Sequence, residues 1–154
     1  MLCQKYPLLQ ATVLDLEETR PIARRLIESS GLGDRVRFRP ADYLRDHYGR
    51  GNDVVLLSGV LHGEAPKDCL RMLRRAWASL VPGGRVVVQE VLLNEERTGP
   101  LLAALFSLHM TRGASYTGAQ IAAWLAETGF SGVEVRLLSG YSWLNGLIVG
   151  RRPV

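Results

Sequence analysis

Short apolar runs alternate along the chain with stretches whose apolar residues recur every three or four positions. The first pattern is typical of buried strands, and the second is typical of helices that cover a sheet. Strands are predicted at residues 11–15, 35–38, 53–62, 85–90, 132–138 and 143–150, and helices at residues 21–30, 66–80, 99–110 and 117–128. This alternation predicts an α/β fold, a doubly wound and mostly parallel sheet with helices on both faces. The last two strands are expected to form an antiparallel hairpin at one edge.

Two polar residues close neighbouring apolar strands, His62 after the run from Asp53 and Glu90 after the run from Arg85. One helix-length segment separates the two runs and is closed by Pro82-Gly83-Gly84. A strand, a crossover helix and a second strand give parallel neighbours, so both residues are expected at the carboxyl edge of the sheet. Open α/β sheets bind ligands at this edge. A histidine beside a carboxylate there is a candidate general base with its orienting partner.

The start of the chain departs from the usual pattern of such sheets. Residues 2–7 indicate the end of a helix, and the strand that follows ends on Asp15. An acid that ends the second strand of a nucleotide-binding sheet typically accepts hydrogen bonds from ribose hydroxyls. Asp15 is therefore interpreted as a second-strand acid whose first strand is missing. From the residue alone, a turn or the first turn of a helix is the alternative explanation of Asp15.

Composition narrows the class of protein. The 154 residues suit one domain, and 47% hydrophobic with 22% charged residues is usual for a soluble globular protein. The net charge is +4, but the arginines are spread along the chain without interleaved aromatics, which disfavours nucleic-acid binding. No apolar run approaches the length of about 20 residues that spans a membrane, so a cytoplasmic location is expected. Cys3 and Cys69 lack metal-ligand spacing, so neither a metal site nor a disulfide is expected.

Several segments, in their order and spacing, resemble one enzyme family. They are Tyr6-Pro7, Val13 to Leu16, Ala41-Asp42-Tyr43, Val60-Leu61-His62, Leu80 to Val88, Glu90, Gly99 to Met110 and Thr117 to Phe130. The chain resembles the catalytic domain of class I S-adenosylmethionine-dependent O-methyltransferases, the group with caffeate-type, acetylserotonin-type and bacterial natural-product enzymes. The resemblance implies a Rossmann-like fold and assigns residues 1–154 to a partial catalytic domain. It also implies S-adenosylmethionine as cofactor, a small hydroxyl-bearing acceptor and a homo-oligomer.

The resemblance also implies roles for individual residues. His62 would remove the proton of the acceptor hydroxyl, and Glu90 would hold the imidazole in its useful tautomer. Phe106 and Met110, one helical turn apart, would line the acceptor pocket, whereas Leu101, Leu102 and Leu105 of the same segment are compatible with plain core packing. The residues expected to hold the cofactor are Asp15 and Leu16 at the ribose and adenine, Asp42 and Tyr43 at the adenine, and Ser58 where relatives often carry a lysine.

The sequence departs from the family pattern in three ways. The glycine-rich cofactor loop with its strand and the helical N-terminal dimerisation domain are missing. His62 is followed by Gly63-Glu64 in place of Asp-Trp, and Ser115 stands where a second acid often flanks the base. A non-catalytic methyltransferase-fold module that acts in assembly is therefore the alternative, and a nicotinamide-dependent Rossmann protein is a weaker one. The missing strand would lie in the middle of the sheet, so its absence leaves two strand edges without hydrogen-bond partners. These edges are expected to be paired directly with each other, by strand exchange or by oligomerisation.

Overall fold

The structure, a computed structural model, describes residues 2–111, 113–138 and 144–154. The chain divides into two compact units, Met1–Tyr48 and Gly49–Val154, and each is described by itself. Trp143, which was expected to begin the last strand, lies outside the described residues.

The first unit is a small strand–helix–strand arrangement. Its elements are α1 (Leu2–Lys5), β1 (Ala11–Asp15), the 3-10 helix η1 (Glu17–Thr19), α2 (Arg20–Ser29) and β2 (Val36–Pro40). β1 and β2 are parallel and in continuous register from Ala11 opposite Val36 to Asp15 opposite Pro40. Pro21 lies in the first turn of α2, where its missing N–H has no intrahelical partner to lose, and Gly31 follows the helix with a φ of 66°. The predicted strand, helix and strand of this region are thus confirmed.

The second unit is built on a four-stranded mixed sheet. Its main elements are β3 (Asn52–Ser58), the 3-10 helix η2 (Leu61–Gly63), α3 (Pro66–Ser79), β4 (Leu80–Glu90), α5 (Gly118–Thr128), β7 (Ser131–Leu137) and β8 (Gly146–Arg151). The strand order is β3-β4-β8-β7, with β3 parallel to β4 and β8 antiparallel to both of its neighbours. The expected C-terminal hairpin of β7 and β8 is confirmed. Its second strand, β8, pairs with β4, and β7 lies at the edge of the sheet.

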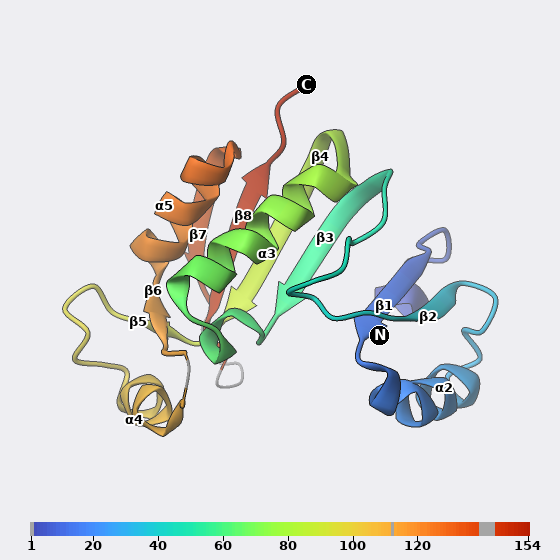
Figure 1. Ribbon diagram of the computed structural model, residues 1–154, viewed down its shortest axis with the longest axis horizontal. Helices are drawn as coiled ribbons and strands as arrows, with labels where there is room; N and C mark the ends of the chain where they lie inside the picture. Colours follow the sequence, from blue (N-terminus) through green and yellow to red (C-terminus); the bar gives the residue numbers. More distant parts are fainter. Residues whose placement is uncertain (1, 112, 139–143) are drawn as a thin grey trace. The chain divides into compact units, whose positions relative to one another are not determined.

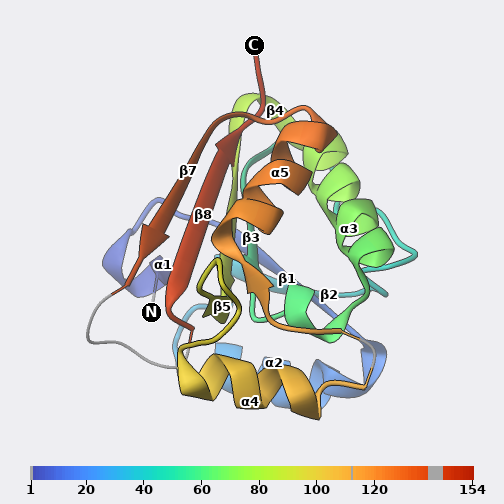
Figure 2. The same cartoon turned by 90° about the vertical axis from the view of Figure 1, so that its left-hand side faces the viewer.

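Both long helices of this unit, α3 and α5, lie on the same face of the sheet (Figures 1 and 2). The side chains of Val86, Val88 and Ile148 point into this layer and are fully buried. Leu56, on the opposite face, remains 48% exposed. α5 begins with a capping box in which the Thr117 hydroxyl accepts from the Gln120 N–H.

The connection between α3 and β4 differs from the predicted bounds. β4 begins at Leu80, directly after α3 ends at Ser79, so Pro82-Gly83-Gly84 lies within the strand and the strand starts earlier than the predicted residue 85. The strand tolerates the glycines through a register shift against β3 and a φ of 80° at Gly83. Within their own units β1 pairs with β2 and β3 pairs with β4, and the expected closure beside the missing strand, by direct pairing, strand exchange or oligomerisation, stays a prediction.

A third group of elements lies at the carboxyl end of β4. It comprises β5 (Leu92–Leu93), α4 (Leu101–His109) and β6 (Tyr116–Thr117), and β5 and β6 form a short parallel pair that the sequence did not predict. α4 starts close to the predicted position. Core packing does not account for its leucines, because Leu101, Leu102 and Leu105 are 73%, 60% and 55% exposed.

Candidate active site

His62 lies just beyond the carboxyl end of β3, on the single turn η2. β3 ends at Ser58, and Gly59 turns the chain with a φ of 63° that a residue with a side chain rarely adopts. The Gly59 N–H donates to the carbonyl of Gln89 at 2.8 Å, so the turn stays attached to β4 where that strand ends. This geometry brings His62 beside Glu90, as the predicted strand–helix–strand unit implied.

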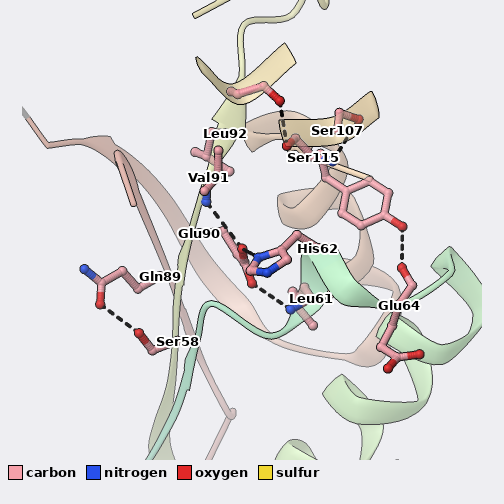
Figure 3. Close-up of polar contacts among 12 residues, drawn as sticks. Ser58, Leu61, His62, Glu64, Gln89, Glu90, Val91, Leu92, Ser107 and Ser115 are labelled. Atoms are coloured by element: carbon pink, nitrogen blue, oxygen red, sulfur yellow. Dashed lines mark hydrogen bonds and ion pairs between the residues drawn. The ribbon is translucent and has the colours of Figure 1, made fainter. Parts of the chain in front are cut away.

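The imidazole of His62 contacts the carboxylate of Glu90 directly (Figure 3). His62 Nδ1 lies 2.7 Å from Glu90 Oε2, and the two side chains are 12% and 2% exposed. The carboxylate is itself fixed, because its Oε1 accepts from the Leu61 N–H at 2.6 Å and its Oε2 from the Val91 N–H at 3.3 Å. Backbone donors thus hold Glu90 from both η2 and the end of β4.

This arrangement determines which ring nitrogen carries the proton. An ionised carboxylate can only accept hydrogen bonds, so Nδ1 donates to Glu90 when the imidazole is neutral. Nε2 is then left with a lone pair and can accept a proton from a substrate. A proton gained at Nε2 creates a cation that Glu90 stabilises at close range. The pair can therefore act as a general base with an orienting carboxylate.

Phe106 of α4 forms an apolar wall beside the imidazole. Its ring meets that of His62 edge-on, with centroids 4.9 Å apart and an interplanar angle of 78°. Phe106 packs against a buried cluster of Val91, Leu93 and Ala103, which anchors α4 next to the end of β4. Met110 is the C-cap of α4 and is half-buried, one residue beyond the helix that carries Phe106. A predicted acceptor residue and the predicted base therefore touch.

The turn that carries His62 is held from behind by residues that the sequence did not single out. The hydroxyl of Tyr116 donates to the Glu64 carbonyl at 2.6 Å, and the thiol of Cys69 lies 3.3 Å from the Leu61 carbonyl. Burial raises the pKa of the Cys69 thiol to about 12 and also raises the pKa of the Tyr116 phenol. Both groups therefore remain protonated donors at neutral pH. The one feature of the sequence that could have indicated this support is Tyr116, a polar aromatic residue directly before the helix cap Thr117.

Ser115 and Ser58 both use their hydroxyls within the fold. Ser115, at the place where relatives often carry a second acid, donates to the Ala103 carbonyl at 3.0 Å and so ties its loop to α4. Ser58 donates to Gln89 Oε1 at 3.1 Å. Because Gln89 and Glu90 alternate along β4, Ser58 lies on the face of the sheet opposite to the Glu90 carboxylate. A cofactor contact by Ser58 would have to share that bond with Gln89.

The acids expected to hold the cofactor lie together in the first unit. Asp15 ends β1, Asp42 follows β2, and the Ala41 N–H donates to the Asp15 carbonyl at 2.8 Å. Asp15 Oδ1 accepts from the Leu16 N–H at 2.8 Å, and Asp42 Oδ1 accepts from the Leu44 N–H at 2.8 Å. Both carboxylates are therefore oriented locally with one oxygen and keep the second as an acceptor, although Asp42 Oδ2 lies 3.5 Å from Arg45 Nε.

The remaining predicted cofactor residues flank these acids. Leu16 directly follows Asp15 and is 47% exposed, as expected of a side chain that could cover a ligand. Tyr43 is half-buried, and its carbonyl accepts from the Tyr48 hydroxyl at 2.8 Å. Across the part of the chain that the structure describes, no group of three or more His, Cys, Asp or Glu side chains could hold a metal ion. None of the described helices is both long and apolar enough to cross a membrane.

Comparison with known proteins identifies relatives over nearly all of the chain. The chain is 35% identical over 153 residues to 3-hydroxy-5-methyl-1-naphthoate 3-O-methyltransferase from Streptomyces sahachiroi, covering 97% of this chain and 44% of that protein. It is 29% identical over 157 residues to L-tyrosine C(3)-methyltransferase from Streptomyces lavendulae, covering 98% and 43%. The structure matches the apo form of the S-adenosylmethionine-dependent methyltransferase SibL with a TM-score of 0.90 at 35% identity, covering 99% and 46%.

The chain thus spans less than half the length of the relatives it matches. The similarity to SibL confirms the mixed α/β fold. The family described as the O-methyltransferase domain matches residues 1–131, which include both acids of the first unit and the His62–Glu90 pair. The chain belongs to the O-methyltransferase domain family.

Proposed function

We propose that this chain is part of an S-adenosylmethionine-dependent O-methyltransferase in which His62 is the general base for a hydroxyl of a small acceptor. The observation that carries the proposal is the His62–Glu90 pair at 2.7 Å, with a buried carboxylate that two backbone N–H groups fix in place. Family membership and relatives that methylate hydroxyl groups support the same chemistry.

The residues present fit the cofactor in the chemistry of their donors. Asp15 and Asp42 offer carboxylate oxygens at one edge of the β1–β2 pair, which suits ribose hydroxyls and an adenine amino group. Leu16 would flank the adenine and Tyr43 would lie against the ring. When bound, S-adenosylmethionine supplies an electrophilic methyl group on a sulfonium sulfur.

The chain's own part in the reaction is to prepare the acceptor. Nε2 of His62 accepts the proton of the acceptor hydroxyl, which raises the electron density on the oxygen that attacks the methyl carbon. Glu90 then faces the imidazolium and stabilises it, while Phe106 keeps this side of the site apolar. General-base catalysis of this kind contributes about 10²–10⁴-fold to the rate. A planar, ring-bearing acceptor would suit the apolar side chains of Phe106 and Met110 beside the base.

Methyl transfer to carbon is the rival activity, because one relative is named as an L-tyrosine C(3)-methyltransferase. The two activities differ in the position of the new methyl group. Incubation with S-adenosylmethionine labelled in the methyl group and with 3-hydroxy-5-methyl-1-naphthoate as probe distinguishes them, and this is referred to below as the hydroxynaphthoate assay. Product carrying a methoxy group supports the proposal, whereas a ring methyl group contradicts it.

Binding of S-adenosylhomocysteine, measured by calorimetry, tests the cofactor site. The wild-type protein is expected to bind, and Asp15→Asn is expected to weaken binding at least about tenfold, since a hydrogen bond from a hydroxyl to a charged acceptor is worth roughly 1.5–3 kcal/mol. Asp34→Asn, in the exposed turn before β2, is the matched control and should bind like the wild type. No binding by the wild type would favour the non-catalytic module.

The pH dependence of the hydroxynaphthoate assay tests His62 as the base. His62→Ala should lose at least about 10²-fold in rate at pH 7, because the acceptor keeps its proton there. The loss should shrink as the pH approaches about 10, where a phenolic hydroxyl ionises without help. An equal loss at every pH would remove His62 from the role of base.

A further inference from the structure

A segment outside the proposed catalytic pair packs directly against the turn that carries His62. A Cβ added to Gly113 would lie 1.9 Å from the His62 carbonyl oxygen, 2.6 Å from the Glu64 nitrogen and 2.7 Å from the Gly63 carbonyl carbon. Real Cβ atoms never approach backbone this closely, so only glycine fits here without moving η2. The backbone at Gly113 therefore defines where the His62 turn can lie.

Tyr116, three residues further on, holds the same turn at its far end. Its hydroxyl donates to the Glu64 carbonyl at 2.6 Å, and only 6% of the residue is exposed. The Tyr116 ring is itself fixed edge-on against Trp124 of α5, with centroids 4.8 Å apart. The contact thus connects η2 to a helix that lies on the sheet (Figure 2).

The segment between these residues is tied to the other walls of the site. Ser115 donates from its hydroxyl to the Ala103 carbonyl at 3.0 Å and from its N–H to the Ser107 hydroxyl at 3.1 Å, both on α4 (Figure 3). Tyr116 and Thr117 form β6, which pairs with β5 directly after Glu90 and Val91. One short stretch therefore contacts the His62 turn, the Phe106 helix and the continuation of the Glu90 strand.

We infer that residues 113–117, the bracing segment, set the position of the imidazole relative to Glu90 and the acceptor, with Gly113 and Tyr116 as positioning residues. This inference rests on the proposed function of His62. Both residues contact the backbone of the turn that carries the base, and the acceptor role is left to Phe106 and Met110. Loss of the bracing segment should therefore affect catalysis through geometry and leave cofactor binding intact.

Tyr116→Phe is the decisive variant, because it removes one hydroxyl and keeps the ring against Trp124. The kcat of the hydroxynaphthoate assay is expected to fall about three- to tenfold, the effect of one hydrogen bond. Gly113→Ala should lower kcat further, by about 10²-fold, because a displaced turn misaligns the base. Affinity for S-adenosylhomocysteine should not change in either variant.

Ser79→Ala is the matched control. It removes another buried hydroxyl that donates to a carbonyl, from Ser79 to Ala76 at 2.9 Å, at the end of α3 away from η2. Two readouts separate positioning from stability, the His62 imidazole resonances in the NMR spectrum and the pH dependence of kcat. Tyr116→Phe and Gly113→Ala should shift the His62 resonances and lose less activity at alkaline pH. Ser79→Ala should do neither.

The outcomes separate this inference from the proposed function. If His62→Ala abolishes activity at pH 7 while Tyr116→Phe leaves kcat and the His62 resonances unchanged, the bracing role is wrong and the base survives. If Tyr116→Phe shifts the His62 resonances but His62→Ala keeps full activity, the proposed base is wrong instead. Equal effects of Tyr116→Phe and Ser79→Ala on both readouts would overturn the inference. The hydrogen bond from Tyr116 to the Glu64 carbonyl would then stabilise the fold without positioning His62.

Discussion

Replacing Glu90 by glutamine tests the proposed pair with the smallest change in shape. The carboxylate accepts three hydrogen bonds, from the Leu61 N–H at 2.6 Å on Oε1 and from His62 Nδ1 at 2.7 Å and the Val91 N–H at 3.3 Å on Oε2. Glutamine keeps one acceptor oxygen and replaces the other with an NH₂ group. The NH₂ group therefore takes the position of either Oε1 or Oε2, and a hydrogen-bond donor then stands where the wild type has an acceptor.

The geometry decides which site changes. Leu61 is fully buried and its N–H has the shorter bond, so the amide oxygen is expected to stay there. The NH₂ group then faces His62 Nδ1, which can accept its hydrogen only if the ring proton moves to Nε2. That tautomer cannot accept a proton at Nε2, so the base is lost. The Val91 N–H also loses its acceptor, at a cost of about 1–3 kcal/mol for a buried group.

Three measurements on Glu90→Gln check this argument. The His62 ring nitrogens in the NMR spectrum should show the proton on Nε2. The hydroxynaphthoate assay should lose at least about 10²-fold in kcat, the lower end of general-base catalysis. Urea denaturation should show a loss of about 1–3 kcal/mol in the free energy of unfolding. Glu134→Gln, whose side chain is 59% exposed on β7, is the control and should change none of these. An unchanged tautomer together with unchanged kcat would refute the reasoning.

Three further predictions concern stability and are measured by urea denaturation. Gly146→Ala should cost about 1–3 kcal/mol, because the new Cβ would lie 2.1 Å from buried Leu92; Gly33→Ala, with no atom within 4 Å, should cost under about 0.5 kcal/mol. Thr117→Ala removes the capping box and should cost about 0.5–2 kcal/mol. The Cys69 thiol has its pKa raised from 9.0 to about 12, so its stabilising contribution is complete below pH 9 and is lost as the pH rises toward 12. Between pH 8 and pH 10 the wild type should lose roughly 1 kcal/mol more than Cys69→Ala; identical losses would contradict the burial argument.

The contact between His62 and Glu90 could be predicted from the sequence because its geometry follows from local rules. Two parallel strands joined by a crossover helix must end at the same edge, and that rule alone brings His62 to Glu90. The position of Phe106 beside His62 is compatible with the acceptor role that the resemblance implies for Phe106. Strand and helix positions were predicted well for the same reason, because each reflects a periodicity that its own residues carry.

The contacts of the bracing segment could not be predicted in this way. Gly113 and Tyr116 lie about fifty residues beyond the turn that they touch, and neither belongs to a periodic pattern. The exposed leucines of α4 show a related limit, since periodicity reports that a helix has an apolar face and not what covers it. The register shift between β3 and the first residues of β4 was not predicted, because Pro-Gly-Gly is compatible both with a turn and with an irregular strand.

The division of the chain into two compact units makes the two parts of the proposed function independently testable. The acids Asp15 and Asp42 lie in Met1–Tyr48, whereas His62, Glu90 and Phe106 lie in Gly49–Val154. Asp15→Asn should therefore weaken binding of S-adenosylhomocysteine without moving the His62 resonances, which depend on Glu90 and η2. Glu90→Gln should move those resonances without weakening that binding. If either variant produced both effects, the assignment of cofactor binding to Asp15 and of base chemistry to the His62–Glu90 pair would be wrong.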